Sequence, residues 1–235
     1  MKPKPKAASP LRAESAPARF LFGGQDFTIV DRTALHWPAQ SALLVADLHL
    51  EKGSWFAERG QMLPPYDSLA TLDRLIALVA QTQARTIWAL GDNFHDSAGP
   101  ERMAPAIRAR LDALFARVDL RWITGNHDEA LADGLGGTIL PEDACEGLIL
   151  RHRADPAERG FELSGHWHPK LAVSARGRRV TRPCFVRSAT RLILPAFGAY
   201  TGGMAAHDPA IMVLTGPDSE ALLAGPQGVA RFPLG

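Results

Sequence analysis

The stretch Ala42-Leu43-Leu44-Val45-Ala46-Asp47-Leu48-His49 decides the fold, because a short apolar run stops abruptly at residues that can bind a metal. The same pattern returns four times along the chain, at TIWALGDN (86–93), LRWITGNHD (120–128), LILRH (148–152) and FELSGHWH (161–168). Short apolar runs of this kind are typical of strands that are buried on both faces. We therefore expect five such strands, each ending at a polar cluster.

Helical patterns separate the first three of these runs. Tyr66–Ala80 and Met103–Ala116 each place apolar residues at helical spacing. Strands that alternate with helices predict a layered α/β fold. Ligands of such sheets bind beyond the carboxyl ends of the strands, where all the polar clusters fall. The sequence thus predicts one composite site.

Outside these motifs, the sequence predicts a flexible N-terminal tail, a short hairpin and a strand-rich C-terminal part. Residues 1–18 are rich in Pro, Ala, Lys and Ser and are expected to be a flexible tail, and residues 19–235 a single domain. Two short strands are expected at the start of this domain, at Phe20–Phe22 and Phe27–Val30, around a Gly23-Gly24 turn. Beyond Pro169 the predicted strands are Leu171–Ser174, Arg179–Val186, Arg191–Leu194 and Ile211–Leu214. They suggest a second sheet packed on the first.

Composition places the chain among soluble globular proteins. Hydrophobic residues make up 46% and charged residues 22% of it, and the formal net charge is +1. This net charge does not indicate a nucleic-acid binder, although a local basic patch would be enough for one. The sequence contains no apolar run long enough to span a bilayer, and Met1–Arg19 has no apolar core of a signal peptide. We expect a cytoplasmic protein with no membrane contact.

The polar clusters supply the ligand types that a pair of divalent metals needs: carboxylates, imidazoles and an amide. The candidates are Asp47, His49, Asp92, Asn126, His152, His166 and His168. On extended backbone, the two members of each D-x-H or H-x-H pair would point the same way. The glycines before Asp92, Asn126 and His166 suit sharp turns and close backbone approach.

In this order, the motifs D-x-H, G-D-x, G-N-H-D, H and G-H-x-H resemble those of the calcineurin-like metallophosphoesterases. The resemblance covers roughly Ala42 to Pro169. Each motif alone is short, but all of them in order, each after an apolar run, form a specific signature. The resemblance implies a layered metallophosphoesterase fold, with two packed β-sheets flanked by helices.

It also implies a role for each candidate residue. One metal would be held by Asp47, His49 and His168, and the other by Asn126, His152 and His166, with Asp92 bridging the two. His127 would face the scissile phosphate and protonate the leaving group, and Asp128 would orient or polarise His127. The ligand set suits manganese, which the resemblance favours, and also iron or zinc.

The implied mechanism is hydrolysis without a covalent enzyme intermediate. The two metals would lower the pKa of a bridging water and clamp the phosphate oxygens. The resulting hydroxide would attack phosphorus in line, while the metals and His127 stabilise the charge that develops on the departing oxygen.

One segment indicates which branch of this superfamily the chain resembles, namely Gly91-Asp92-Asn93-Phe94-His95-Asp96. It lacks the arginine of the G-D-x-x-D-R-G motif in Ser/Thr protein phosphatases. Phe94-His95 instead is similar to the G-D-x-F-H form of double-strand-break repair nucleases, which places His95 near the active site. With the small size and the segment Leu194–Gly203, the chain most resembles the bacterial ligase-associated DNA damage response endonucleases (PdeM). That family implies a manganese-dependent phosphodiesterase acting on DNA, with a DNA ligase and a helicase as partners.

Two other functions are also consistent with these sequence features. A small-molecule phosphatase or nucleotide phosphodiesterase would use the same metal core, and a non-catalytic scaffold could use the fold to dock a ligase or helicase. His95 is equally consistent with a supporting or exposed loop histidine. The basic cluster of Arg176, Arg178, Arg179, Arg182, Arg187 and Arg191 could line a groove for a nucleic-acid backbone, but a solvated strand face is the favoured interpretation. No chemical role follows from the sequence of Leu194–Gly203.

Overall fold

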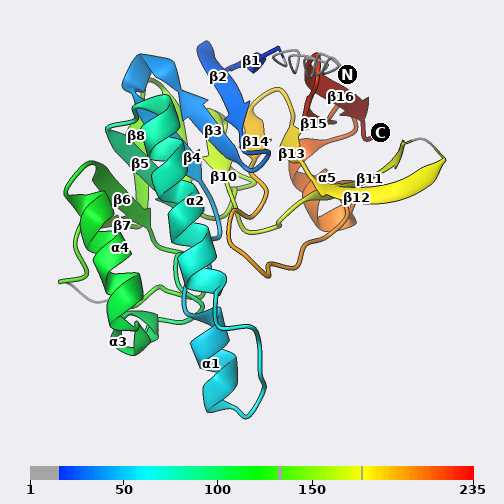
Figure 1. Ribbon diagram of the computed structural model, residues 1–235. Coiled ribbons are helices and arrows are strands. Elements are labelled where there is room, and N and C mark those ends of the chain that lie inside the picture. The colour runs from blue at the N-terminus through cyan, green and yellow to red at the C-terminus, as the bar shows by residue number, and fades with distance from the viewer. Residues whose placement is uncertain (1–15, 132–133, 176) are drawn as a thin grey trace, which may run out of the picture.

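The apolar runs form strands of two large β-sheets in the computed structural model (Figure 1), which describes residues 16–131, 134–175 and 177–235. Residues 1–15 of the predicted tail and Arg176 of the basic cluster lie outside the described residues. Within the described residues, none of the helices is long and apolar enough to cross a membrane.

The first sheet follows chain order across its width. Among the described residues its strands are β1 (Ala18–Phe22), β2 (Gln25–Val30), β3 (Ala34–Trp37), β4 (Ala42–Val45), β5 (Thr86–Leu90), β6 (Asp119–Ile123) and β7 (Thr138–Leu140). The predicted hairpin is confirmed, since β1 pairs antiparallel with β2 around Gly23 and Gly24. From β4 to β7 the pairing is parallel, so the carboxyl ends of β4, β5 and β6 lie at one edge of the sheet.

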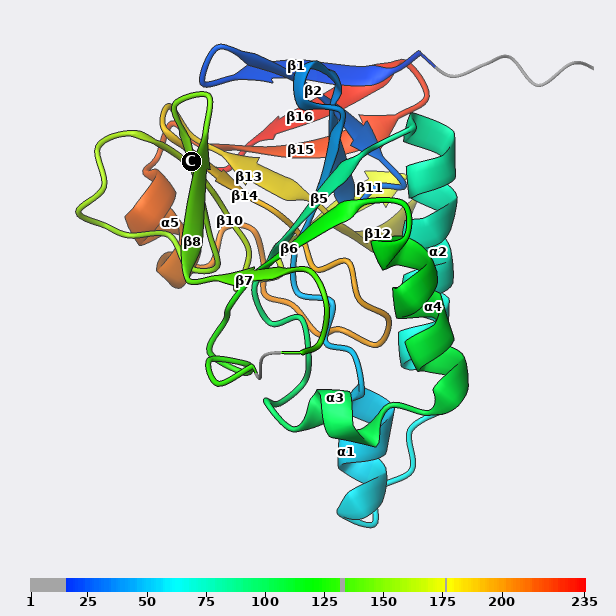
Figure 2. The same ribbon diagram turned by 90° about the vertical axis from the view of Figure 1, so that its left-hand side faces the viewer.

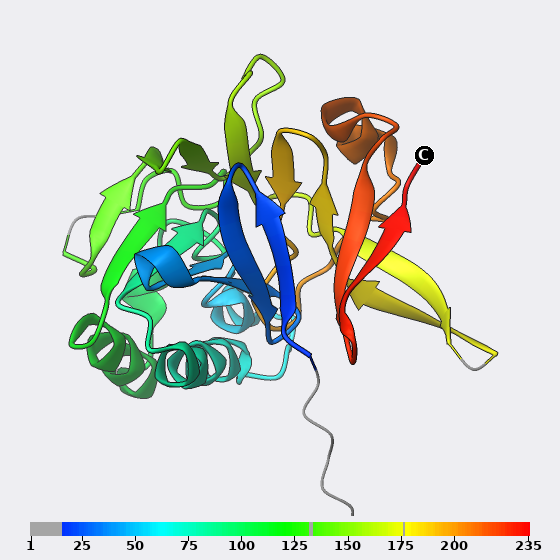
Figure 3. The same cartoon turned by 90° about the horizontal axis from the view of Figure 1, so that it is seen from above.

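The second sheet is built mostly from the later part of the chain. Among the described residues its strands are, in spatial order, β16 (Gly228–Pro233), β15 (Glu220–Gly225), β13 (Phe185–Arg187), β14 (Arg191–Ile193), β10 (Phe161–Ser164), β9 (Leu148–Arg151) and β8 (Glu142–Cys145). Strands β9, β10 and β14 are parallel to one another. A separate ribbon, β11 (Lys170–Ala175) with β12 (Arg178–Pro183), extends away from this sheet (Figures 1 and 3).

Helices cover the outer faces of the sheets (Figure 2). The described helices are η1 (Pro38–Gln40), α1 (Lys52–Glu58), α2 (Asp67–Thr82), α3 (Gly99–Arg102), α4 (Pro105–Phe115) and α5 (Pro209–Thr215). Leu72 of α2 and Leu111 of α4 are fully buried in the core cluster on the first sheet, and Ile211 of α5 is fully buried in the cluster on the second. A third cluster, which includes Trp37 and Leu163, fills the space between the sheets. The expected layered α/β fold, two packed sheets flanked by helices, is thus confirmed.

Two details of the predicted elements are wrong. Ile211–Leu214, predicted as a strand, belongs to helix α5. Asp208 caps this helix, because its carboxylate accepts the Ala210 N–H at 3.0 Å, and Pro209 occupies the first helical turn, where its missing N–H costs nothing. The strand predicted over Arg179–Val186 is divided between β12 and β13, because the chain leaves the ribbon after Pro183 and enters the second sheet.

The segment Leu194–Gly203 packs directly against the first strand-end motif. The N–H of Phe197 donates to the carbonyl oxygen of Ala46 at 2.8 Å, and that of Gly198 to the carbonyl oxygen of Asp47 at 3.1 Å. A Cβ at Gly198 would lie 2.0 Å from the carbonyl oxygen of Leu48, so this approach requires glycine. The segment therefore supports the backbone that carries Asp47 and His49.

We predict that Gly198→Ala lowers the free energy of unfolding by about 1–3 kcal/mol, because the added methyl group forces two backbone segments apart. Urea unfolding followed by circular dichroism measures this. Gly202→Ala is the matched control: a Cβ there meets no atom within 4 Å, so its stability should stay within about 0.5 kcal/mol of the parent chain. Equal stability of the two variants would contradict the proposed packing.

Candidate metal centre

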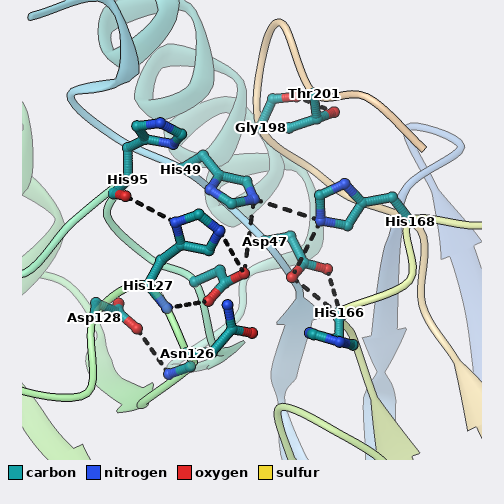
Figure 4. A network of polar contacts seen from close by, with 12 residues as sticks. Asp47, His49, His95, Asn126, His127, Asp128, His166, His168, Gly198 and Thr201 are labelled. Atoms are coloured by element: carbon teal, nitrogen blue, oxygen red, sulfur yellow. Dashed lines mark hydrogen bonds and ion pairs between the residues drawn. The ribbon is translucent and has the colours of Figure 1, made fainter. Parts of the chain in front are cut away.

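The structure brings the predicted ligands together where the carboxyl ends of strands from both sheets meet (Figure 4). Asp47 and His49 follow β4, Asp92 follows β5, and Asn126 follows β6. The second sheet contributes His152 after β9, and His166 and His168 after β10. The structure thus brings the predicted ligand residues together at one place, and their meeting depends on how the two sheets pack.

Asp47, His49 and His168 form a first donor group, with one ligand atom from each lying within 4.8 Å of the others. The Nε2 atoms of His49 and His168 are 3.4 Å apart, and Nε2 of His168 is 3.4 Å from Oδ1 of Asp47. Asp47 is fully buried and His49 is 5% exposed. These three residues are those expected to share one metal.

A second donor group consists of Asp92, His152 and His166, and one ligand atom from each again lies within 4.8 Å of the others. Nε2 of His152 lies 3.0 Å from Oδ1 of Asn126 and 3.1 Å from Nδ1 of His166. The carboxylate of Asp92 faces both groups: Oδ1 is 3.4 Å from Nε2 of His152, and Oδ2 is 3.9 Å from Nε2 of His49. This position is the one expected of a bridging carboxylate.

The chemistry of the donor atoms fits divalent cations. Burial, with a smaller contribution from His168, lowers the pKa of His49 to about 2. Burial, and then His152, also lowers the pKa of His166 below its usual value. For His49 and His166 the neutral imidazole is therefore favoured, and it offers a lone pair to a metal. Within the described residues, the basic side chains that lie within 4.0 Å of the carboxylates of Asp47 and Asp92 are histidines, and no lysine or arginine pairs with either carboxylate. Buried charge of this kind needs a positive partner.

The expectation of extended backbone at the paired ligands is wrong. The φ angles are 53° at Asp47, 45° at His49, 46° at Asp92, 76° at His166 and 47° at His168. Residues other than glycine rarely adopt this left-handed region, and they do so where surrounding contacts impose it. Here the loops hold one another, since the N–H groups of Asp47 and His49 donate to the carbonyl oxygens of Gly91 and Asp92 at 3.1 and 2.9 Å.

Gly91 shows why glycine precedes Asp92. Its φ is 79°, and a Cβ there would lie 2.2 Å from Nδ1 of His152. The loop after β5 therefore passes the imidazole of His152 at a distance that only glycine permits. The expected close backbone approach is confirmed at this position.

His127 lies beside the donor groups and is 39% exposed. Its Nδ1 is 2.9 Å from the carbonyl oxygen of His95. A carbonyl can only accept, so Nδ1 carries a proton and donates it. Nε2 then lies on the side of the donor groups, 4.0 Å from Oδ2 of Asp92. His127 can donate from Nε2 only as an imidazolium.

His95 also packs in this region. Its ring stacks on that of His127 with centroids 5.2 Å apart, and burial lowers the pKa of His95 to about 4. On its other side, Trp55 and Phe56 of α1 lie with ring centroids 4.8 and 5.7 Å away. The sequence did not associate these two aromatic residues with the site, because nothing in α1 resembles a ligand motif. His49, His95 and His127 also bring ring nitrogens within 4.8 Å of one another.

Asp128 was expected to orient the imidazole of His127, but its contacts in the structure are with backbone amides. Its buried carboxylate accepts the backbone N–H groups of Gly125, Asn93 and Phe94 at 2.7, 2.8 and 3.2 Å. It thus ties the loop after β6 to the loop after β5. Burial raises the pKa of Asp128, and the three amides act in the opposite direction.

Comparisons with known proteins identify the family of the chain. Residues 41–172 match the family model for calcineurin-like phosphoesterase. The crystal structure of the Pseudomonas putida nuclease MPE is 31% identical, with a TM-score of 0.71, over 92% of this chain and 100% of that chain.

More distant matches are Yfce, a phosphoesterase from E. coli, and a protein of unknown function, AQ665, from Aquifex aeolicus. Yfce is 18% identical over 83% of this chain and 99% of that chain, with a TM-score of 0.40. AQ665 is 14% identical over 58% of this chain and 81% of that chain, with a TM-score of 0.38. No match was found among the curated proteins.

The family match covers more than half of the chain, and the nuclease aligns over its whole length. The chain therefore belongs to the calcineurin-like phosphoesterase family and is a metal-dependent phosphoesterase.

Proposed function

We propose that this protein is a phosphodiesterase that binds two divalent metal ions and cleaves nucleic acid, with DNA as its substrate. One observation carries the proposal: the buried carboxylate of Asp92 faces ring nitrogens of both donor groups, with Oδ2 3.9 Å from Nε2 of His49 and Oδ1 3.4 Å from Nε2 of His152. The 31% identity to a nuclease supports phosphodiester substrates over phosphate monoesters.

The roles of the ligands follow the two donor groups. Asp47, His49 and His168 would hold one ion, and Asn126, His152 and His166 the other, with Asp92 shared. When bound, the ions would supply Lewis-acid charge for the phosphate oxygens and an acidified water as nucleophile. Manganese is the proposed metal because the sequence resemblance favours it. Ligands of the imidazole, carboxylate and amide type, without a thiolate, suit iron or zinc as well.

His127 is the proposed general acid. The carbonyl oxygen of His95 fixes Nδ1 of His127, which leaves Nε2 facing the donor groups. An imidazolium in this orientation can donate a proton to the departing oxygen of the ester. His95 thereby acts on His127 through its backbone oxygen and through ring stacking.

The proposed cellular setting is DNA repair in the cytoplasm, beside a DNA ligase and a helicase. This part of the proposal follows from the sequence resemblance to the ligase-associated endonucleases.

The first prediction from the proposed function concerns the substrate class. With Mn²⁺, the purified protein should hydrolyse bis-p-nitrophenyl phosphate faster than p-nitrophenyl phosphate, and a chelator should abolish the reaction. Asp92→Asn should lower turnover by at least about a hundredfold, because the amide cannot neutralise two cations. Release of p-nitrophenol measures each rate.

Asp73→Asn is the matched control, since Asp73 is exposed on α2 and pairs with Arg110. It should retain the parent rate. Preference for the monoester would instead support a small-molecule phosphatase, and no turnover of either ester would support a scaffold.

The second prediction concerns the leaving group. His127→Ala should keep the metal content of the parent chain but lower kcat by about 10²–10⁴-fold for esters with poor leaving groups. The loss should be much smaller for p-nitrophenolate, which departs without a proton. A series of diesters whose leaving groups differ in pKa, with metal measured by mass spectrometry, tests this. An equal loss across the series would contradict the role of His127 as general acid.

A further inference from the structure

A basic pocket lies next to the first donor group, on the side of His168, with a volume of about 340 Å³. Its cationic side chains are Arg32, Arg74, Lys170 and Arg182, and Asp31 is the one carboxylate among its described lining residues. Positive charge beside a phosphoesterase site is a feature that catalysis at the donor groups does not require.

The four cations do not serve the same purpose. Arg74 is occupied by the fold, since its guanidinium donates to Asp31 at 2.8 Å and to the carbonyl oxygen of Phe197 at 2.9 Å. Lys170 is partly occupied, because Nζ donates to the carbonyl oxygen of Thr201 at 3.2 Å. Arg32 and Arg182 are exposed, and neither forms an ion pair within the part of the chain that the structure describes. These two arginines give the pocket a charge that nothing in it neutralises.

The positive surface continues away from the site. A second hollow of about 170 Å³ shares Arg32, Arg182 and Pro183 with the basic pocket and reaches Leu223 of β15. On the opposite side of the donor groups, next to His152 and His166, lies a hollow of about 440 Å³ in which two arginines balance two glutamates. The donor groups therefore lie between two open hollows, and only one of them is basic. This arrangement suits a chain that crosses the site better than a small ester enclosed in it.

Of the described arginines in the predicted basic cluster, Arg182 alone lines the pocket. Arg187 pairs with Glu220 at 2.6 Å, and Arg191 pairs with Glu162 at 2.8 Å. Arg178 and Arg179 are exposed on β12, as the interpretation of a solvated strand face requires.

We propose that Arg32, Lys170 and Arg182 bind backbone phosphate of a single nucleic-acid strand, on the side of His168, while the scissile phosphate lies at the donor groups. This inference rests on the proposed nuclease function and adds the subsite that selects a polynucleotide. Cations in a groove follow a strand by neutralising its phosphates and releasing counterions. Tyr200, 49% exposed in the lining of the pocket, offers an aromatic face on which a base can stack.

The test separates binding from hydrolysis. Fluorescence anisotropy with a labelled single-stranded DNA oligonucleotide measures Kd with Mn²⁺ bound, in the His127→Ala background that slows hydrolysis, for the otherwise unchanged chain and for the double variant Arg32→Ala/Arg182→Ala. Removing two charge-assisted contacts should raise Kd by roughly 10- to 100-fold. The slope of log Kd against log salt should fall by about 0.7 for each cation removed. With His127 intact, turnover of bis-p-nitrophenyl phosphate with Mn²⁺ should fall by much less than Kd for the oligonucleotide rises, because that ester has no neighbouring backbone phosphate for the arginines to bind.

Arg179→Ala is the matched control. Arg179 is exposed on the same strand as Arg182 but does not line the pocket, so its loss should leave Kd nearly unchanged. The proposal is overturned if the parent chain binds no oligonucleotide, if the double variant binds as tightly as the parent, or if Arg179→Ala weakens binding equally. Strand binding that depends on the two arginines, without turnover of any diester, would refute the proposed hydrolysis while leaving the subsite in place.

Discussion

The burial of two carboxylates, Asp47 and Asp92, with no lysine or arginine to pair with them among the described residues, is the constraint on which the rest of the structure depends. Both side chains are almost inaccessible, with 0% and 3% exposure. Histidines are the only basic side chains that pair with them within the described residues, and burial lowers the pKa of one of these, His49, to about 2. Burying carboxylates without positive partners is costly, and breaking a buried pair usually costs several kcal/mol. The protein therefore builds an arrangement that bound cations complete.

The two-sheet architecture explains how this arrangement is held. The first sheet supplies Asp47, His49, Asp92 and Asn126, while the second supplies the remaining imidazoles. The core between the sheets, including Trp37 and Leu163, therefore sets the distance between the two sets of ligands. Left-handed backbone at five ligands is held by hydrogen bonds between neighbouring loops, by the carboxylate of Asp128 and by the segment that contains Gly198. The fold thus determines the positions of the donor atoms before any ligand is bound.

Sequence alone predicted the layered α/β fold and the meeting of the polar clusters. Each short apolar run is a strand, and the polar, metal-binding residue types that follow it mark the end of that strand. The sequence could not predict the left-handed backbone at Asp47 and His49, since alternation implies extended geometry and the loop contacts that override it are distant in sequence. The helix at Pro209–Thr215 was missed because four apolar residues in a row suit either a strand or a helix. The cap at Asp208 was the available signal. The role of Asp128 depends on which amides surround it, and that information exists only in three dimensions.

The basic pocket likewise could not be predicted from the sequence. Arg32 follows β2, Lys170 begins β11 and Arg182 lies in β12, so the three cations come from segments that share no motif. A net charge of +1 for the whole chain hides a local excess of positive charge beside His168. The arginine cluster that the sequence did suggest is mostly used for ion pairs or lies on an exposed strand.

A titration of the metal-free protein with Mn²⁺ tests the central claim most directly, with calorimetry to count the bound ions and thermal unfolding to measure their effect. If cations compensate Asp47 and Asp92, about two ions should bind per chain. The midpoint of unfolding should then rise with Mn²⁺ concentration, since a ligand that binds only the native state stabilises it. A chain that binds no Mn²⁺, iron or zinc and unfolds at the same temperature with and without them would contradict the claim.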